Sequence, residues 1–272
     1  PMSWWINPHS GSIQLNPLLP LDILYGSQHN ESYGGIWTAH HQELANFLHR
    51  SGSWNSVFEI GGAHGILSRN FQEFQPSADW TILEPNPKLV DGARAKVLTG
   101  FFDEHFQYNE PFDVLVHSHV FEHIYEPFQF IAQLSQFIPQ GKHMVFSIPN
   151  MRKQLESYFT NCLNFEHTVF LPEEFVHWLL ETNGFTIISK QNFLEHSTFY
   201  HVQNTGTRST SPCPNLYSGN RALFENFVHY HDHLVSTLNQ TLENTTKTVY
   251  LFGAHIFSLY LLFHGLKSNR IK

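Results

Sequence analysis

The sequence predicts an α/β fold built around a mostly parallel sheet. Short apolar runs alternate with amphipathic stretches between residues 57 and 189, which is typical of strand–helix–strand crossover units. A glycine-rich turn, residues 61–65, separates the first apolar run from the first amphipathic stretch. The chain has 272 residues, of which 41% are hydrophobic, so it is long enough to bury a full core and too apolar to be disordered.

The expected elements follow the chain in order. After a beginning that prolines and glycines interrupt, residues 37–49 carry apolar side chains on or near one face and predict a helix, which ends at Gly52. Strands are expected at residues 57–60, 80–83, 112–116, 143–148, 185–189 and 248–252. Further helices are expected at residues 66–74, 127–137, 172–182, 222–244 and 256–264.

This pattern divides the chain into three parts. Residues 1–50 are expected to form an N-terminal helical lid, and residues 51–203 the central α/β domain. Residues 204–272 are expected to form a linker, a long helix and the beginning of a C-terminal α/β appendage. Because one strand and one helix cannot form a core alone, we expect this appendage either to pack on the first domain or to continue beyond Lys272 in the natural protein.

Composition and charge exclude several classes of protein. The chain has 15 Lys and Arg against 23 Asp and Glu, and this net charge of −8 argues against a general nucleic-acid binder. No apolar run is long enough to span a bilayer and no secretory signal is recognisable, so we expect a cytoplasmic protein. Two cysteines, Cys162 and Cys213, cannot form a disulfide framework or a four-thiolate zinc site.

The 20 histidines raise the question of a metal site. No His-Glu-x-x-His motif and no zinc-finger spacing is present. The nearest approaches are the pair His40-His41 and the alternating His229, His231 and His233, which a helix would scatter around its axis. The sequence therefore predicts no metal site.

The strongest local signal is the turn that follows the first strand. Glycines let the backbone turn tightly and approach a ligand closely, and the helix that follows offers N–H groups. The G-x-G-x-x-G fingerprint of dinucleotide folds fails at Ala63 and Ile66, which argues against a dehydrogenase. Counted from the preceding acid, the pattern is acid-x-Gly-x-Ala-x-Gly, with Glu59, Gly61 and Gly65.

This pattern resembles the first motif of class I S-adenosylmethionine-dependent methyltransferases. Four further segments agree in order and spacing: Glu84 at the end of the second strand, residues 112–123, residues 138–142 and residues 183–185. The resemblance covers residues 55–190 and implies a Rossmann-like, mostly parallel seven-stranded sheet with helices on both faces. It also implies S-adenosylmethionine as the cofactor. The residue type at Glu84 has a chemical reason, because a carboxylate there can accept hydrogen bonds from both ribose hydroxyls. The implied cofactor-binding residues are Glu59, Gly61, Gly62, Ala63, Gly65, Glu84, Pro85, Phe101, Phe102, His117 and Ser118.

A narrower resemblance lies in residues 164–167, Asn-Phe-Glu-His. This segment is similar to the Glu-His segment of methyltransferases that act on nucleotide sugars, and residues 250–255 resemble the start of the C-terminal Rossmann-like domain of that group. The zinc-binding cysteines of the group are absent, and Asn164 stands where the group has tyrosine. O-methylation is therefore expected at least as much as C-methylation.

The resemblance and the chemistry together predict roles at the acceptor. A histidine suits proton removal near neutral pH, so His167 is the first candidate for the general base, with Glu166 orienting it. His119 and His123 are the second candidates for the base. Substrate-binding residues are expected where aromatic and polar side chains mix with glycines, and at the Glu-His segment: Tyr25, Asn30, Tyr33 and Asn164.

The predicted function is transfer of a methyl group to a nucleotide-linked or glycan sugar, as in sugar modification and polysaccharide biosynthesis. A small-molecule O- or N-methyltransferase of secondary metabolism is the alternative among enzymes. A non-catalytic protein that keeps the fold to bind a partner is the alternative outside enzymes. The expected partner is a small sugar or nucleotide-sugar substrate, with no nucleic acid and no membrane span, and a homodimer is possible.

Overall fold

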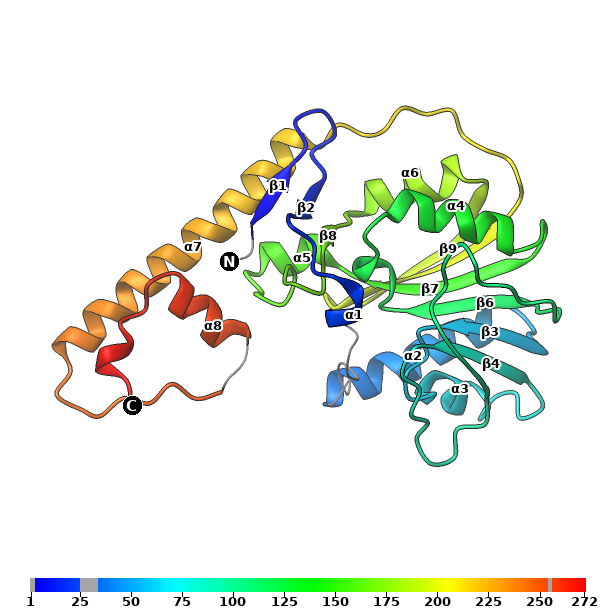
Figure 1. Cartoon of the computed structure of the whole chain (residues 1–272), viewed down its shortest axis with the longest axis horizontal. Helices are drawn as coiled ribbons and strands as arrows, with labels where there is room; N and C mark the ends of the chain where they lie inside the picture. Colours follow the sequence, from blue (N-terminus) through cyan, green and yellow to red (C-terminus); the bar gives the residue numbers. More distant parts are fainter. Residues whose placement is uncertain (1–2, 25–33, 254–255) are drawn as a thin grey trace. The chain divides into compact units, whose positions relative to one another are not determined.

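The computed structural model describes residues 3–24, 34–253 and 256–272, which form two compact units (Figure 1). We call the first the sheet unit; it contains Leu18–Asn150 and Leu171–Pro214. We call the second the long-helix unit; it contains Pro1–Pro17, Met151–Phe170 and Asn215–Lys272. The chain therefore passes between the two units several times.

A seven-stranded sheet forms the centre of the sheet unit, with the order β5-β4-β3-β6-β7-β10-β9. From β5 to β7 neighbouring strands are parallel, whereas β10 is antiparallel to both β7 and β9. The mostly parallel seven-stranded sheet is thus confirmed. Its strands are β3 (Ser56–Ile60), β4 (Asp79–Glu84), β5 (Lys96–Thr99), β6 (Val114–Ser118), β7 (His143–Pro149), β9 (Phe185–Phe193) and β10 (Ser197–Asn204).

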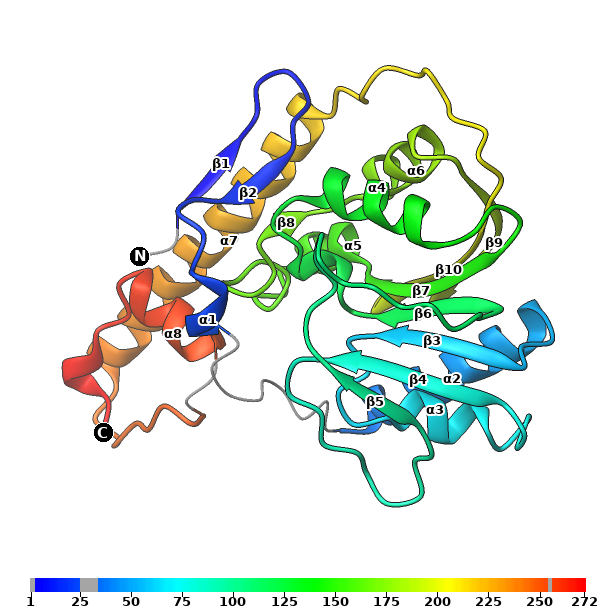
Figure 2. The same ribbon diagram turned by 45° about the vertical axis from the view of Figure 1, so that its right-hand side comes forward.

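Helices cover both faces of this sheet (Figures 1 and 2). On one face lie α2 (Gly35–Ser51) and α3 (Ile66–Phe71), and on the other lie α4 (Pro127–Phe137) and α6 (Glu173–Thr182). The bounds of α4 agree with the prediction, because Pro127 occupies the first turn, where its missing N–H costs nothing. The short helices α1 (Leu21–Leu24) and η1 (Phe121–His123) complete the unit.

The core of the sheet unit explains the uninterrupted apolar runs of the sequence. In β3, Val57 packs in the cluster formed with α2 and α3, while Phe58 packs with Phe112 and Phe137 on the other face. Strands with both faces buried lack the apolar–polar alternation of a half-exposed sheet. The core of the sheet unit therefore lies on both faces of the sheet.

The long-helix unit contains a second, three-stranded sheet of order β1-β2-β8, with β1 (Trp4–Ile6), β2 (Ile13–Leu15) and β8 (Val169–Phe170). Its helices are α5 (Met151–Glu156), α7 (Tyr217–Asn244), α8 (Ile256–Phe263) and η2 (Ser268–Arg270). Buried leucines of α7 and α8, Leu242 and Leu261, pack in one apolar cluster. Residues 1–50, expected to form a helical lid, thus contain the strands β1 and β2 in addition to the helices α1 and α2.

The strand predicted at residues 248–252 is wrong. Only Val249 forms a bridge, to Ile271, while Tyr250 is 71% and Phe252 99% exposed. An apolar run needs neighbouring strands to become part of a sheet, and the described residues provide none here. Within the described ranges, no helix is long and apolar enough to cross a membrane.

Candidate active site

The predicted cofactor residues gather at one edge of the sheet unit. Strands β3, β4 and β6 are parallel, and Ile60 lies beside both Leu83 and His117. The carboxyl ends of these strands therefore meet at the same edge. The order of strands also reverses there, since β4 and β5 extend to one side of β3 and β6 and β7 to the other. Open α/β sheets bind ligands at such a reversal.

The glycine turn lies at this edge with little room for side chains. Gly61 has a φ of 72°, and its N–H donates to the Leu83 carbonyl at 2.9 Å. A Cβ on Gly61 would lie 2.6 Å from Cγ2 of Val120, which belongs to the loop after β6. The turn after β3 and the loop after β6 are therefore in close contact, and only glycine fits between them.

Glu84 connects the end of β4 to this turn. Its Oε2 accepts a hydrogen bond from the Ala63 N–H at 3.2 Å, and its Oε1 accepts one from the Asn86 N–H at 3.1 Å. The carboxylate is half-buried, and each oxygen keeps a further lone pair for another donor. Pro85 begins the segment that packs on the turn, where the Lys88 N–H donates to the Ala63 carbonyl at 3.2 Å.

Glu59 supports the turn from inside the core. Only 3% of the residue is exposed, and Nε1 of Trp80 donates to its Oε2 at 2.7 Å. Burial, with a contribution from the Glu84 carboxylate, raises the pKa of Glu59 to about 8. A Cβ on Gly62 would lie 2.8 Å from this carboxyl group, so Glu59 packs directly against the turn.

This burial makes the stability of the protein depend on the charge of Glu59. Between about pH 4.5, where a free glutamate ionises, and pH 8, the folded state retains a proton that the unfolded state has lost. Stability is therefore lost as the pH rises through this window. We expect Glu59→Gln to remove this loss and to be more stable than the wild type at pH 8 by about 1–3 kcal/mol.

Urea unfolding of both proteins at pH 5, 6.5 and 8 measures this difference. Glu73 is exposed, so the variant Glu73→Gln is the control for the loss of one negative charge. A constant stability difference between E59Q and the wild type at all three pH values would contradict the expectation.

His117, expected near the cofactor, lies in the core. The residue is fully buried, and its ring stacks on Phe146 with 4.8 Å between the ring centroids. Phe121 and Phe130 cover other sides of the ring. Burial lowers the pKa of His117 to about 3, so the ring is neutral at pH 7. This environment favours a packing role.

The two phenylalanines after β5 have different environments. The ring of Phe102 packs among Phe106, Phe130 and Phe137, with centroid distances of 5.9, 5.9 and 5.1 Å. Phe101 is 45% exposed. Of the two, Phe101 thus offers the larger accessible surface to a ligand.

The loop after β6 brings the second candidate bases together around a buried acid. Ser118, at the end of β6, shares a hydrogen bond of 2.9 Å with the Ser147 hydroxyl. Glu122 is fully buried, and its Oε1 lies 2.9 Å from Nδ1 of His119 and 3.9 Å from Nε2 of His123. His119 has a φ of 51°, a conformation that is uncommon for any residue except glycine. The loop therefore holds His119 in a fixed, strained position.

The first candidate base belongs to the long-helix unit. Oδ1 of Asn164 accepts hydrogen bonds from the N–H groups of Glu166 at 2.7 Å and His167 at 3.0 Å. Nδ1 of His167 lies 3.2 Å from the Cys162 carbonyl, which can only accept, so Nδ1 carries the proton. In the neutral ring, Nε2 is then the basic nitrogen. The side chain of Asn164, which is expected to bind substrate, orders this turn.

Tyr25, Asn30 and Tyr33, the other residues expected to bind substrate, lie outside the described residues.

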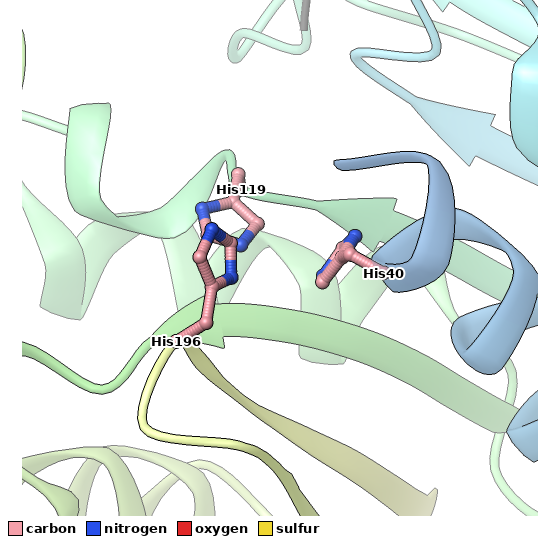
Figure 3. A group of neighbouring side chains, drawn as sticks. All are labelled: His40, His119 and His196. Carbon is pink, nitrogen blue, oxygen red and sulfur yellow. The ribbon is translucent and has the colours of Figure 1, made fainter. Parts of the chain in front are cut away.

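Sequence analysis missed a histidine cluster in the sheet unit. His40 of α2 and His196 of the turn between β9 and β10 lie beside His119 (Figure 3). Burial lowers the pKa of both His40 and His196, which makes them neutral at pH 7. The three residues come from distant segments, so no local spacing could have revealed them.

The comparison with protein families decides the class of the protein. A family described as "Methyltransferase domain" matches residues 35–190, which is more than half of the chain. The chain belongs to this methyltransferase family. The family uses S-adenosylmethionine, so the predicted class of enzyme and its cofactor are confirmed. No curated protein has a significantly similar sequence.

Solved methyltransferase structures resemble this methyltransferase in fold. The mitomycin 7-O-methyltransferase MmcR has a TM-score of 0.50 and 16% identity, over 61% of this chain and 54% of the other. The magnesium protoporphyrin IX methyltransferase ChlM from Synechocystis PCC 6803 has a TM-score of 0.48 and 17% identity, over 70% of this chain and 93% of the other. The N-methyltransferase NodS from Bradyrhizobium japonicum WM9 has a TM-score of 0.46 and 18% identity, over 62% of this chain and 96% of the other.

Proposed function

We propose that this methyltransferase binds S-adenosylmethionine at the carboxyl ends of β3, β4 and β6 and methylates a nucleotide-linked or glycan sugar, with His167 as the general base. The observation that carries the acceptor side of the proposal is the turn of residues 164–167, in which Asn164 fixes the Glu-His pair. The cofactor side rests on the edge of the sheet unit described above.

The residues at that edge fit an adenosine with a charged tail. Glu84 would accept the two ribose hydroxyls, because its half-buried oxygens are already oriented by two backbone N–H groups. Gly61, Gly62, Ala63 and Gly65 would bring the backbone close to the ligand, and a Cβ at any of the three glycines would lie within 2.8 Å of a neighbouring side chain. Ser118 and Pro85 would line the edge on either side, and Phe101 would contact the adenine.

The reaction requires the protein to align the acceptor with the methyl group and to remove a proton. When bound, S-adenosylmethionine would supply a methyl group on a sulfonium, and in-line attack by the acceptor on the methyl carbon would release the thioether S-adenosylhomocysteine. The chain must hold the acceptor in that line and take up the proton that a hydroxyl loses. His167 suits this task since its hydrogen bond to Cys162 leaves Nε2 basic, and Glu166 would stabilise the charged ring.

Calorimetric titration with S-adenosylhomocysteine tests the cofactor site. We expect the wild type to bind one equivalent and Glu84→Ala to bind about 10–100-fold more weakly, because two charge-assisted hydrogen bonds are lost. The exposed acid Glu73 provides the matched control, and Glu73→Gln should bind like the wild type. Equal affinities of E84A and the wild type would exclude Glu84 from the site.

An acceptor screen tests the sugar. Nucleotide sugars are compared with phenols and amines as acceptors, and methyl transfer is followed by mass spectrometry. Methylation of a nucleotide sugar supports the proposal. Methylation of phenols or amines alone would replace it with a small-molecule O- or N-methyltransferase, and cofactor binding without any transfer would favour a binding protein.

A further inference from the structure

Three histidines of the sheet unit surround a common point. Their ring centroids form a nearly equilateral triangle, with 5.0 Å between His40 and His119 and 5.5 Å on each of the other two sides. One ring nitrogen from each residue lies within 4.8 Å of one ring nitrogen from each of the others. Figure 3 shows the rings converging from helix α2, from the loop after β6 and from the β9–β10 turn.

Within the described part of the chain, His40 is buried without a polar partner for its ring, as is His117 in the core, but the ring of His40 packs against the rings of the two other histidines of the cluster. It is 0% exposed, and among the described residues neither of its ring nitrogens has a hydrogen-bond partner. A buried polar group without a partner destabilises the folded state, and native proteins rarely leave one. A ligand between the three rings would provide the missing interaction.

The surroundings of the other two rings fit a metal site. Oε1 of the fully buried Glu122 lies 2.9 Å from Nδ1 of His119, which leaves Nε2 to face elsewhere. Histidines that bind a metal usually contact a carboxylate through their other ring nitrogen, which fixes the ring. The Ser197 hydroxyl lies 2.9 Å from that Nε2 and 2.6 Å from Nδ1 of His196, so two ring nitrogens already point to one polar atom.

The geometry points to a site for a divalent transition metal ion of the zinc class, bound by His40, His119 and His196. Zn–N bonds of about 2.0–2.1 Å in a tetrahedron place the nitrogens about 3.4 Å apart. The ring nitrogens, which lie within 4.8 Å of one another, must therefore approach by at most about 1.4 Å. Rotation of the side chains can supply this movement. The ion would replace the Ser197 hydroxyl between His119 and His196.

Three protein ligands leave a fourth position for a water or another oxygen ligand. Sites with an open position are typical of catalytic rather than structural zinc. Trp37 packs edge-on against His119 and His196, with 4.8 Å between centroids in each case, and provides an apolar wall on one side. The inference concerns metal binding itself and does not depend on the proposed acceptor or on His167.

The experiment is a titration of the EDTA-treated full chain with Zn²⁺ by calorimetry, and with Co²⁺ by visible absorption. We expect one tight equivalent and the intense absorption of tetrahedral Co²⁺. His196→Ala and His119→Ala should each weaken binding at least about 100-fold, and Glu122→Gln about 10–100-fold. Ser197→Ala should keep the site, because the hydroxyl only competes with the metal.

Adjacent His41 provides the matched control: its ring packs edge-on against His40 with 5.4 Å between the centroids, but its Nδ1 is engaged with the Trp37 carbonyl. His41→Ala should bind Zn²⁺ like the wild type. Circular dichroism of each variant separates loss of the site from loss of the fold. If His40→Ala does not fold, His196→Ala tests the site, because His196 lies in a half-buried turn. Absence of a 1:1 complex in the wild type, or equal weakening by H41A and H196A, would overturn the inference.

Discussion

Replacing His167 with alanine is expected to lower the rate of methyl transfer by about 10²–10⁴-fold, the usual contribution of a general base. Affinity for S-adenosylhomocysteine should not change, since the residues proposed to hold the cofactor belong to another part of the sequence. The physical reason lies in the hydrogen bond between Nδ1 of His167 and the Cys162 carbonyl, which leaves Nε2 as the proton acceptor. Single-turnover rates at saturating cofactor measure the effect without the contribution of product release.

The exposed His233 of α7, which belongs to the same unit, provides the control. His233→Ala should turn over like the wild type. Unchanged turnover in H167A would move the role of the base to His119 or His123, which lie beside Glu122. If the metal site were also confirmed, His123→Ala would be the cleaner of these two tests, because His119 would then be a ligand.

Replacing Gly61 with valine is expected to weaken binding of S-adenosylhomocysteine by more than about 100-fold. Two effects act together. A side chain at a φ of 72° is strained by about 1–3 kcal/mol. The new Cβ would also lie 2.6 Å from Cγ2 of Val120, so the turn and the loop after β6 would have to separate. This separation deforms the edge at which the cofactor is proposed to bind.

Gly141 separates these two effects. Its φ is 88°, but a Cβ there would meet no atom within 4 Å. We expect Gly141→Val to lower thermal stability through backbone strain alone and to bind the ligand like the wild type. Equal losses of ligand affinity in G61V and G141V would show that general destabilisation, rather than the local contact with Val120, causes the effect.

The sequence predicted the elements whose signals are local. The strand that ends at Ile60, the turn at Gly61 and the helix bounds at Pro127 all follow from apolar periodicity and from residues with a special backbone. Strand β10 was not predicted, because a strand between two antiparallel neighbours is defined by pairing with β7 and β9 rather than by its own residues.

Some residues of the candidate site were predicted correctly in position, and others were not. Glu84 was placed at the end of a strand by the motif resemblance, and its contacts with the turn agree with that position. His117 and Phe102 were assigned to the cofactor by motif register, but their side chains pack in the aromatic core. At the end of a strand that is buried on both faces, sequence alternation does not distinguish a side chain that lines a site from one that fills the core.

The histidine cluster was beyond prediction for a different reason. The negative prediction rested on the absence of short ligand spacings, which is the correct criterion only for sites formed by one segment. His40, His119 and His196 lie on a helix, a strand-end loop and a hairpin turn, so only the three-dimensional fold brings them together.

The order in which the chain builds its two units has a consequence for folding. Ile13 of β2 pairs with Phe170 of β8, and the Asn220 side chain donates to the Gly11 carbonyl, so the amino-terminal strands need partners that emerge much later from the ribosome. Contacts of such long sequence separation slow folding, because the loop between them must close first. Strands β1 and β2 can therefore complete their sheet only after β8 has been synthesised, whereas strands β3 to β7 of the large sheet can assemble before that.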